Sequence, residues 1–145
     1  MEKVNHFLIT ALLMMGVTGC GSQDSTIKGS QSEILNEYFD AFNNHDVDGL
    51  SAIVSEDIRL MSVLPDTMTT DLKGRDKLET WLEGYFRSLP NVSSTYSDLT
   101  VREPYYSFVE TATWGPDSAR KQQSSLATYL IKEDKIQRVW YYYPE

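Results

Sequence analysis

The chain has 145 residues, 12% of them aromatic, and a formal net charge of −8. This length is enough for one hydrophobic core, with aromatic side chains to line a core or a cavity, and it excludes two full domains. An acidic chain is repelled by phosphate backbones, so we expect no nucleic-acid partner.

The first residues have the pattern of a bacterial secretion signal. Lys3 precedes an apolar run at residues 7–17, which is too short to span a bilayer as a helix. The run ends in Val-Thr-Gly-Cys at residues 17–20, which resembles the lipobox of bacterial lipoproteins. Cys20 is the only cysteine and cannot form an internal disulfide, so lipidation gives this thiol a role. We expect residues 1–19 to be a lipoprotein signal peptide, with an ordinary signal peptide as the alternative.

Lipidation of Cys20 would anchor the protein to a membrane of the bacterial cell envelope. Gly21 and Ser22 follow the cysteine in place of Asp, a pattern typical of outer-membrane lipoproteins that face the periplasm. Residues 20–31 are polar after the cysteine and rich in Ser and Gly, which favours a flexible tether over a short ordered extension. Residues 32–145 would then form a single domain.

Three helices are predicted in the first part of this domain. Residues 30–33 match a capping box, and the apolar residues after it recur on one helix face as far as Phe42. Asp46 can cap a short second helix that extends to Val54. Residues 78–89 have the apolar spacing of a third helix, which a proline ends.

Six strands are expected where runs of alternating or apolar residues are separated by turn residues. They lie at residues 58–63, 67–72, 92–102, 105–114, 121–131 and 135–143. The helices therefore cluster early and the chain ends in a run of antiparallel strands, an arrangement typical of α+β folds.

Three stretches, at residues 38–57, 74–78 and 135–140, read YFDAFNNHDVDGLSAIVSED, GRDKL and KIQRVW. In their order and spacing they resemble the opening helices, the start of the third helix and the last strand of SnoaL-like proteins. These belong to a ketosteroid-isomerase-like group with the nuclear transport factor 2-like fold. The resemblance covers about residues 32–143. It implies a cone-shaped, curved antiparallel sheet wrapped around a long helix, with two further N-terminal helices and an internal cavity.

Members of this group include isomerases, dehydratases, cyclases, epoxide hydrolases and domains that only bind or dimerise, so the fold does not determine function. Ketosteroid isomerisation needs a carboxylate base and an oxyanion hole of a tyrosine and a neutral aspartic acid. The resemblance places the tyrosine on Tyr38, the base on Ser62 and the neutral acid near Ala127. Serine and alanine cannot take these roles, so we do not expect this reaction. His45 lies at a predicted turn and no histidine lies on a predicted strand, which argues against a histidine-based dehydratase.

Glu110 is the charged residue of greatest interest. It shares a strand face with aromatic residues and alanine over residues 106–114, and the resemblance implies that this face lines the cavity. A carboxyl group there would be desolvated, and a raised pKa would suit proton transfer. A register shift of one residue would instead turn Glu110 to solvent, and both readings stay open. In the cavity reading Glu110 and Tyr38 are catalytic candidates, and the ligand-binding residues are Tyr38, Ser62, Trp81, Tyr85, Trp114, Tyr129, Tyr141 and Tyr143.

The last strand carries bulky residues on both faces. Alternation sends Val139, Tyr141 and Tyr143 to one side and Trp140 and Tyr142 to the other. The second side has the composition of an interface and would suit a homodimer through the outer face of the sheet. A simple aromatic ladder between strands is the alternative.

We expect neither a metal nor a cofactor. Residues 44–49 resemble the start of a calcium-binding EF-hand loop, but the first position is Asn and the required Glu falls on Ser55.

Three functions stay open. The first is a tethered binding domain whose apolar cavity holds a small hydrophobic molecule. The second is a proton-transfer enzyme, similar to an isomerase or dehydratase, that uses Glu110 and Tyr38. The third is a non-catalytic domain that dimerises or docks a partner through Trp140 and Tyr142. We rank them in this order, because the acid-base residues of the best-understood reaction are mostly missing.

Overall fold

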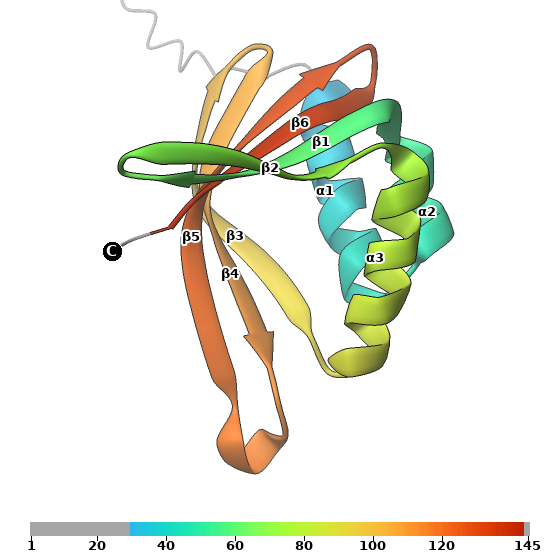
Figure 1. The fold of residues 1–145 in the computed structure, drawn as a ribbon, viewed down its shortest axis with the longest axis vertical. Coiled ribbons are helices and arrows are strands. Elements are labelled where there is room, and N and C mark those ends of the chain that lie inside the picture. Colours follow the sequence, from blue (N-terminus) through green and yellow to red (C-terminus); the bar gives the residue numbers. More distant parts are fainter. Residues whose placement is uncertain (1–29, 144–145) are drawn as a thin grey trace, which may run out of the picture.

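The computed structural model describes residues 30–143, so the expected signal peptide, Cys20 and the tether up to residue 29 lie outside the described residues. Within them the chain forms three α-helices and a six-stranded sheet (Figure 1). The helices are α1 (Ser30–Asn43), α2 (Val47–Ile53) and α3 (Arg75–Ser88). The strands are β1 (Val54–Leu64), β2 (Thr67–Lys73), β3 (Ser93–Arg102), β4 (Tyr105–Trp114), β5 (Lys121–Lys132) and β6 (Lys135–Tyr142), with a 3₁₀ helix η1 (Asp117–Ala119) after β4.

The sheet has the strand order β2-β1-β6-β5-β4-β3 and curves around the helices (Figure 1). Each pair of strands joined by a hairpin is antiparallel, whereas β1 and β6 pair in parallel. The sheet is therefore mixed and differs from the expected antiparallel sheet at this one pairing. No hairpin turn joins β1 to β6, so their relative direction is set by the elements that lie between them in the chain.

The core lies between the helices and the concave face of the sheet. Leu35 on α1 and Tyr106 and Tyr129 on the sheet are fully buried, and the rings of Phe39 and Phe108 meet edge to face at 5.7 Å. Apolar residues recur every three or four positions on a helix and every two on a strand, so one face of each element turns inward. Each large aromatic ring removes roughly 150–250 Å² from water on burial.

The chain passes directly from α2 into β1. Ile53 ends α2, and Val54 is already extended and lies opposite Ile136 of β6. This pairing starts β1 before the expected residue 58, whereas every other strand boundary lies within one residue of its expected place. No helix within residues 30–143 is long and apolar enough to cross a membrane.

Candidate functional site

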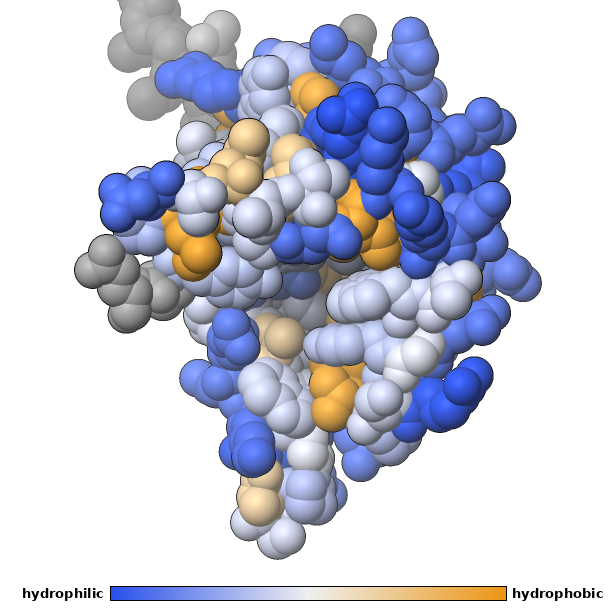
Figure 2. All heavy atoms as spheres, viewed as in Figure 1, coloured by the Kyte–Doolittle hydropathy of each residue, from blue (hydrophilic) through white to orange (hydrophobic). Residues whose placement is uncertain are grey.

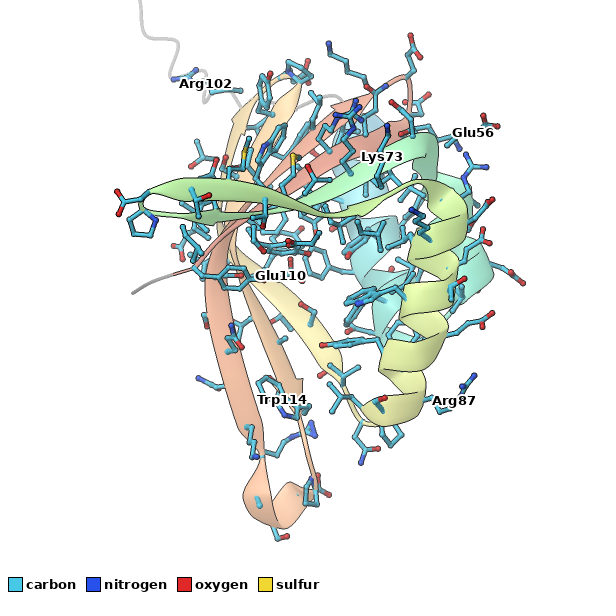
Figure 3. The ribbon with its side chains drawn as sticks, in the orientation of Figure 1. Glu56, Lys73, Arg87, Arg102, Glu110 and Trp114 are labelled. Carbon is cyan, nitrogen blue, oxygen red and sulfur yellow. The ribbon has the colours of Figure 1, made fainter. Side chains whose placement is uncertain are left out.

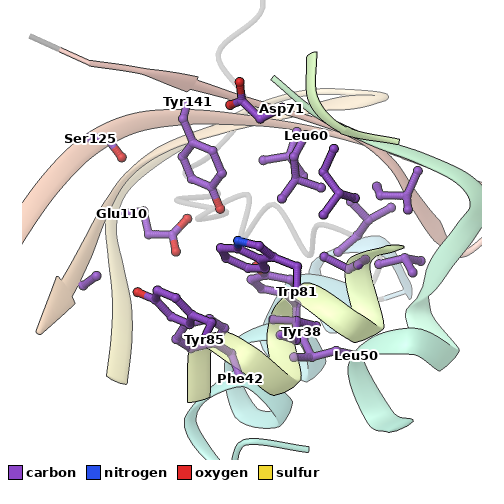
Figure 4. Close-up of a pocket in the computed structure, with 18 of the residues that line it drawn as sticks. Tyr38, Phe42, Leu50, Leu60, Asp71, Trp81, Tyr85, Glu110, Ser125 and Tyr141 are labelled. Carbon is purple, nitrogen blue, oxygen red and sulfur yellow. The ribbon is translucent and has the colours of Figure 1, made fainter. Parts of the chain in front are cut away.

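A pocket of about 560 Å³ lies between the concave face of the sheet and α3 (Figure 4). One side is aliphatic and includes Leu50, Ile58 and Leu60. Figure 2 shows the surface hollowed between α3 and the β4–β5 hairpin, where the pocket opens. Apolar cavities of this size are typical of small-molecule binding sites.

Glu110 is the only charged side chain that is buried among the described residues, with 8% of its surface exposed. It projects from β4 into the pocket, whereas Glu56, Lys73, Arg87 and Arg102 lie at the periphery (Figure 3). The register of β4 therefore turns Glu110 into the cavity and not to solvent.

Two hydroxyl groups hold the Glu110 carboxyl group. Ser94 Oγ donates to Oε1 at 2.8 Å, and the Tyr129 hydroxyl donates to Oε2 at 3.1 Å. Burial raises the pKa of Glu110, and hydrogen bonds from Ser94, Tyr129 and Tyr141 oppose this rise only in part. The group therefore stays neutral to a higher pH than an exposed glutamate, and in that form it can donate a proton.

Three tyrosine hydroxyls gather beside this carboxyl group. Those of Tyr129 and Tyr141 lie 3.1 Å apart, and that of Tyr38 is close enough to interact with both. Burial raises the pKa of all three, and the charge of Glu110 adds to the effect. They therefore stay protonated, and each can donate one hydrogen bond and accept others.

Ser94 is held in place by Asn43, the last residue of α1. Asn43 Nδ2 donates to the Ser94 carbonyl oxygen at 2.9 Å, and the Ser94 amide donates to Asn43 Oδ1 at 2.7 Å. This double contact ties α1 to β3 and directs Ser94 Oγ toward Glu110. Neither residue stands out in the sequence. The available signal is alternation on β3, since Ser94 shares a face with Tyr96, which lies opposite Glu110.

An aromatic pair borders the pocket on α3. The rings of Trp81 and Tyr85 stack at 4.9 Å with 16° between their planes, although 45% of Trp81 is exposed. Figure 4 shows this pair facing Glu110 and Tyr141 across the pocket. The pair therefore offers a flat apolar surface opposite the polar groups.

Residues 35–139 match the family model of the SnoaL-like domain. The chain belongs to the SnoaL-like family. A comparison with curated proteins found no significant match.

Solved structures similar to this SnoaL-like domain share its fold. An uncharacterised cystatin-fold protein from Novosphingobium aromaticivorans is 22% identical, with a TM-score of 0.66 over 77% of this chain and 97% of its own. A putative ketosteroid isomerase from Kribbella flavida is 20% identical, with a TM-score of 0.64 over 80% and 78%. An LEH-like epoxide hydrolase of M. tuberculosis is 14% identical, with a TM-score of 0.63 over 79% and 83%. Identities this low support a common fold and leave the activity open.

The SnoaL-like domain brings most of the predicted ligand-binding residues to the pocket. Ser62 and Tyr129 lie outside the lining: Ser62 donates a hydrogen bond to Asp71, and Tyr129 is fully buried behind Tyr141. Asp71 lines the pocket and was not expected there. The predicted residues that line the pocket are Tyr38, Trp81, Tyr85, Trp114, Tyr141 and Tyr143.

The SnoaL-like domain carries its buried acid on a different strand from the one expected for ketosteroid isomerisation. The neutral-acid position falls near Ala127, which lies on β5 opposite Phe108. Glu110 is two residues further along β4, on the same face as Phe108. The base position, Ser62, carries no carboxyl group, so the residues of that reaction are not assembled.

His45 has a packing role in the SnoaL-like domain. Its ring stacks on Phe86 at 4.3 Å, and its Nε2 lies 2.9 Å from the Val92 carbonyl oxygen. Within residues 30–143 no group of three or more His, Cys, Asp or Glu side chains is placed to hold a metal ion.

The face of β6 that carries Trp140 and Tyr142 lies outside the pocket. Val139 is buried and Tyr141 lines the pocket, whereas Tyr142 is 37% exposed and Trp140 contacts Tyr105 with ring centroids 6.3 Å apart. The expected alternation along this strand is therefore confirmed.

Proposed function

We propose that the SnoaL-like domain binds a small, largely apolar molecule in the pocket beside Glu110. The observation that carries this proposal is the pocket itself, which holds about 560 Å³ and is lined mainly by apolar side chains with a few polar groups at one side. This combination is typical of small-molecule sites, in which apolar burial supplies affinity and a few hydrogen bonds supply orientation. Each Å² of apolar ligand surface removed from water contributes roughly 25 cal/mol.

Native mass spectrometry would test this binding. The chain from residue 21 onward carries every described residue, and its mass is measured before and after extraction with organic solvent. Additional mass that extraction removes would support binding and identify the ligand class. Protein that stays bare, even after incubation with a lipid extract of the producing cells, would contradict the proposal.

We also propose that the protein is a lipoprotein of the bacterial envelope, anchored at Cys20 in the outer membrane and facing the periplasm. The Val-Thr-Gly-Cys pattern at residues 17–20 and the single cysteine support this assignment. Expression of the full chain and of Cys20→Ser tests it. The parent protein should carry diacylglycerol and partition into detergent, and Cys20→Ser should lose both properties. An identical mass shift in both proteins would contradict lipidation at this residue.

The position of Glu110 also favours a second candidate, proton transfer on the bound molecule with Tyr38. Burial raises the pKa of Glu110, and both side chains line the pocket, so a proton could move between Glu110 and a ligand. Glu110→Gln keeps the size and, like the neutral acid, can accept from Ser94 and donate to Tyr129, but it cannot exchange a proton. An enzyme would keep its ligand and lose turnover in this variant, whereas a binding protein would show no turnover in either form.

A further inference from the structure

The hydrogen bonds behind the pocket connect Glu110 to a hydroxyl group in the pocket wall. Glu110 Oε2 lies 3.1 Å from the Tyr129 hydroxyl, which lies 3.1 Å from the Tyr141 hydroxyl. Tyr141 lines the pocket, whereas Tyr129 is fully buried and does not. Each hydroxyl has a single proton, so the direction of one hydrogen bond in this chain sets the direction of the next.

Ser94 determines which oxygen of Glu110 can carry a proton. The Ser94 side chain is 1% exposed, and among the described residues its hydroxyl bonds only to Glu110 Oε1. If Oε1 carried the proton and donated it to Ser94, the Ser94 hydroxyl would have nothing left to donate to, which is costly in a buried site. The proton of neutral Glu110 therefore lies on Oε2, toward Tyr129.

The two protonation states of Glu110 orient the hydrogen bonds through Tyr129 and Tyr141 in opposite directions. When Glu110 is ionised, Tyr129 donates to it. Tyr141 then turns its proton toward Tyr129 or toward the carboxylate itself, and so turns only lone pairs to the pocket. When Glu110 is neutral, Oε2 donates to Tyr129 and Tyr129 donates to Tyr141. The Tyr141 hydroxyl can then donate a hydrogen bond to the ligand. It can also donate to Tyr38, whose hydroxyl then donates a hydrogen bond into the pocket.

The titratable groups that Glu110 affects through its charge are all tyrosines. They come from α1, α3, β5, β6 and the residue after β6: Tyr38, Tyr85, Tyr129, Tyr141 and Tyr143. A second carboxyl group, that of Asp71 on β2, also lines the pocket, acts on Tyr143 and accepts hydrogen bonds from Ser62 and Thr69. No Lys or Arg among residues 30–143 forms an ion pair with Glu110. Desolvation favours the neutral carboxyl group. The hydrogen bonds are therefore donated toward the pocket until the pH exceeds the raised pKa of Glu110.

We propose that Tyr129 transmits the protonation state of Glu110 to Tyr141, and so decides whether the pocket donates or accepts a hydrogen bond. This inference rests on the proposed binding function. With Glu110 neutral, the site prefers an apolar molecule whose oxygen only accepts, such as a ketone or an ester. With Glu110 ionised, it prefers an oxygen that can donate, such as an alcohol. Tyr129 touches no ligand and acts as a positioning residue.

The coupling between Glu110 and Tyr141 can be tested by NMR without any ligand. Tyrosines labelled at the ζ carbon and glutamates labelled at the δ carbon are followed through a pH titration of the lipid-free protein. Tyr141 should show a shift change at the pH where Glu110 ionises. Tyr129→Phe should reduce this change to the part that Glu110 exerts directly on Tyr141 through its charge. Tyr105, exposed on the other face of the sheet, is the control in both proteins. A Tyr141 signal that does not change as Glu110 ionises, or a change of undiminished size in Tyr129→Phe, would overturn the inference.

Ligand preference is tested with two probes of matched shape, 2-acetylnaphthalene, which only accepts, and 1-(2-naphthyl)ethanol, which also donates. Neither probe titrates between pH 4 and pH 10. As Glu110 ionises, the affinity for the ketone relative to the alcohol should fall by about three- to tenfold, the value of one hydrogen bond. In Glu110→Gln, whose amide always donates, the ratio should stay constant. A constant ratio in the parent protein would refute the predicted preference.

The two measurements separate this inference from the binding proposal. Suppose that neither probe binds at any pH, but the NMR signal of Tyr141 still responds to Glu110 through Tyr129. The role of Tyr129 would then be supported, and the binding of small apolar molecules would be contradicted. If both probes bind but Tyr141 does not follow Glu110, binding stands and the transmission by Tyr129 is contradicted.

Discussion

The hydrogen bond from Ser94 to Glu110 sets how far the pKa of the buried acid rises. Ser94 Oγ donates to Oε1 at 2.8 Å and stabilises the ionised form, and this lowers the pKa against the larger effect of burial. Ser94→Ala should therefore raise the pKa of Glu110 further, as measured by carbon NMR of the carboxyl group. Ser93→Ala, on the opposite face of β3, is the control and should leave it unchanged. An unchanged pKa in Ser94→Ala would show that the serine does not act on the carboxyl group.

Individual site residues differ in how far the sequence predicts them. Glu110 can be found because it shares a period-two strand face with aromatic residues, a pattern that local sequence carries. Alternation on β3 can place Ser94 on the inner face of the sheet, but it does not reveal the roles of Ser94 and Asn43, because these depend on a contact between residues 51 positions apart. Tyr129 was expected as a ligand contact, but the depth of a residue below a pocket surface is a property of packing that alternation does not report.

At the scale of single elements, two glycines within helices should respond differently to alanine. A Cβ at Gly84 in α3 would meet nothing within 4 Å, so Gly84→Ala should stabilise the domain by about 0.5–1 kcal/mol. A Cβ at Gly49 in α2 would lie 2.5 Å from Asp46 Oδ2, and the Asp46 side chain caps this helix through the Gly49 amide at 2.9 Å.

In Gly49→Ala, loss of the capping bond from Asp46 should offset the gain in helix propensity, because loss of an N-cap costs roughly 1 kcal/mol. Urea denaturation of the two variants should therefore rank Gly84→Ala above Gly49→Ala in free energy of unfolding. The reverse order would show that Asp46 can move aside without losing its cap.

Most elements follow from local sequence signals, and the exceptions are set by distant pairing. Apolar periodicity located α1 and α3, and turn residues bounded the strand Tyr105–Trp114 at its observed ends. The early start of β1 at Val54 and its parallel pairing depend on β6, about eighty residues later in the chain. Local periodicity contains no information about a partner at that separation.

At the scale of the whole molecule, we expect a second copy of the chain to cover the outer face of the sheet. Tyr105, Leu126 and Tyr142 are between 37% and 48% exposed there, and Trp140 contacts Tyr105. Aromatic residues on an exposed sheet face suit a symmetric interface. Analytical ultracentrifugation should show a dimer that Trp140→Ala weakens, with Trp81→Ala, at the pocket, as the control. A monomer at every concentration would contradict this expectation.

The stability of the whole domain should depend on pH through Glu110. The pKa of Glu110 is raised in the folded protein, so between the ordinary glutamate value and the raised value the folded state holds a proton that the unfolded state has lost. The contribution of this group is therefore fully present below the ordinary value and is lost as the pH rises through the raised one. Glu110→Gln cannot ionise and should escape this loss.

The clearest measurement is the difference in free energy of unfolding between Glu110→Gln and the parent protein, from urea denaturation across a pH series. The difference should be flat at low pH, grow in favour of the variant through the titration of Glu110, and level off above it. Because the chain has a net charge of −8, removal of any carboxylate also relieves repulsion. Glu83→Gln, at an exposed site on α3, removes the same charge and measures that general effect. If Glu83→Gln gave the same profile, the pH dependence would reflect net charge and not the burial of Glu110.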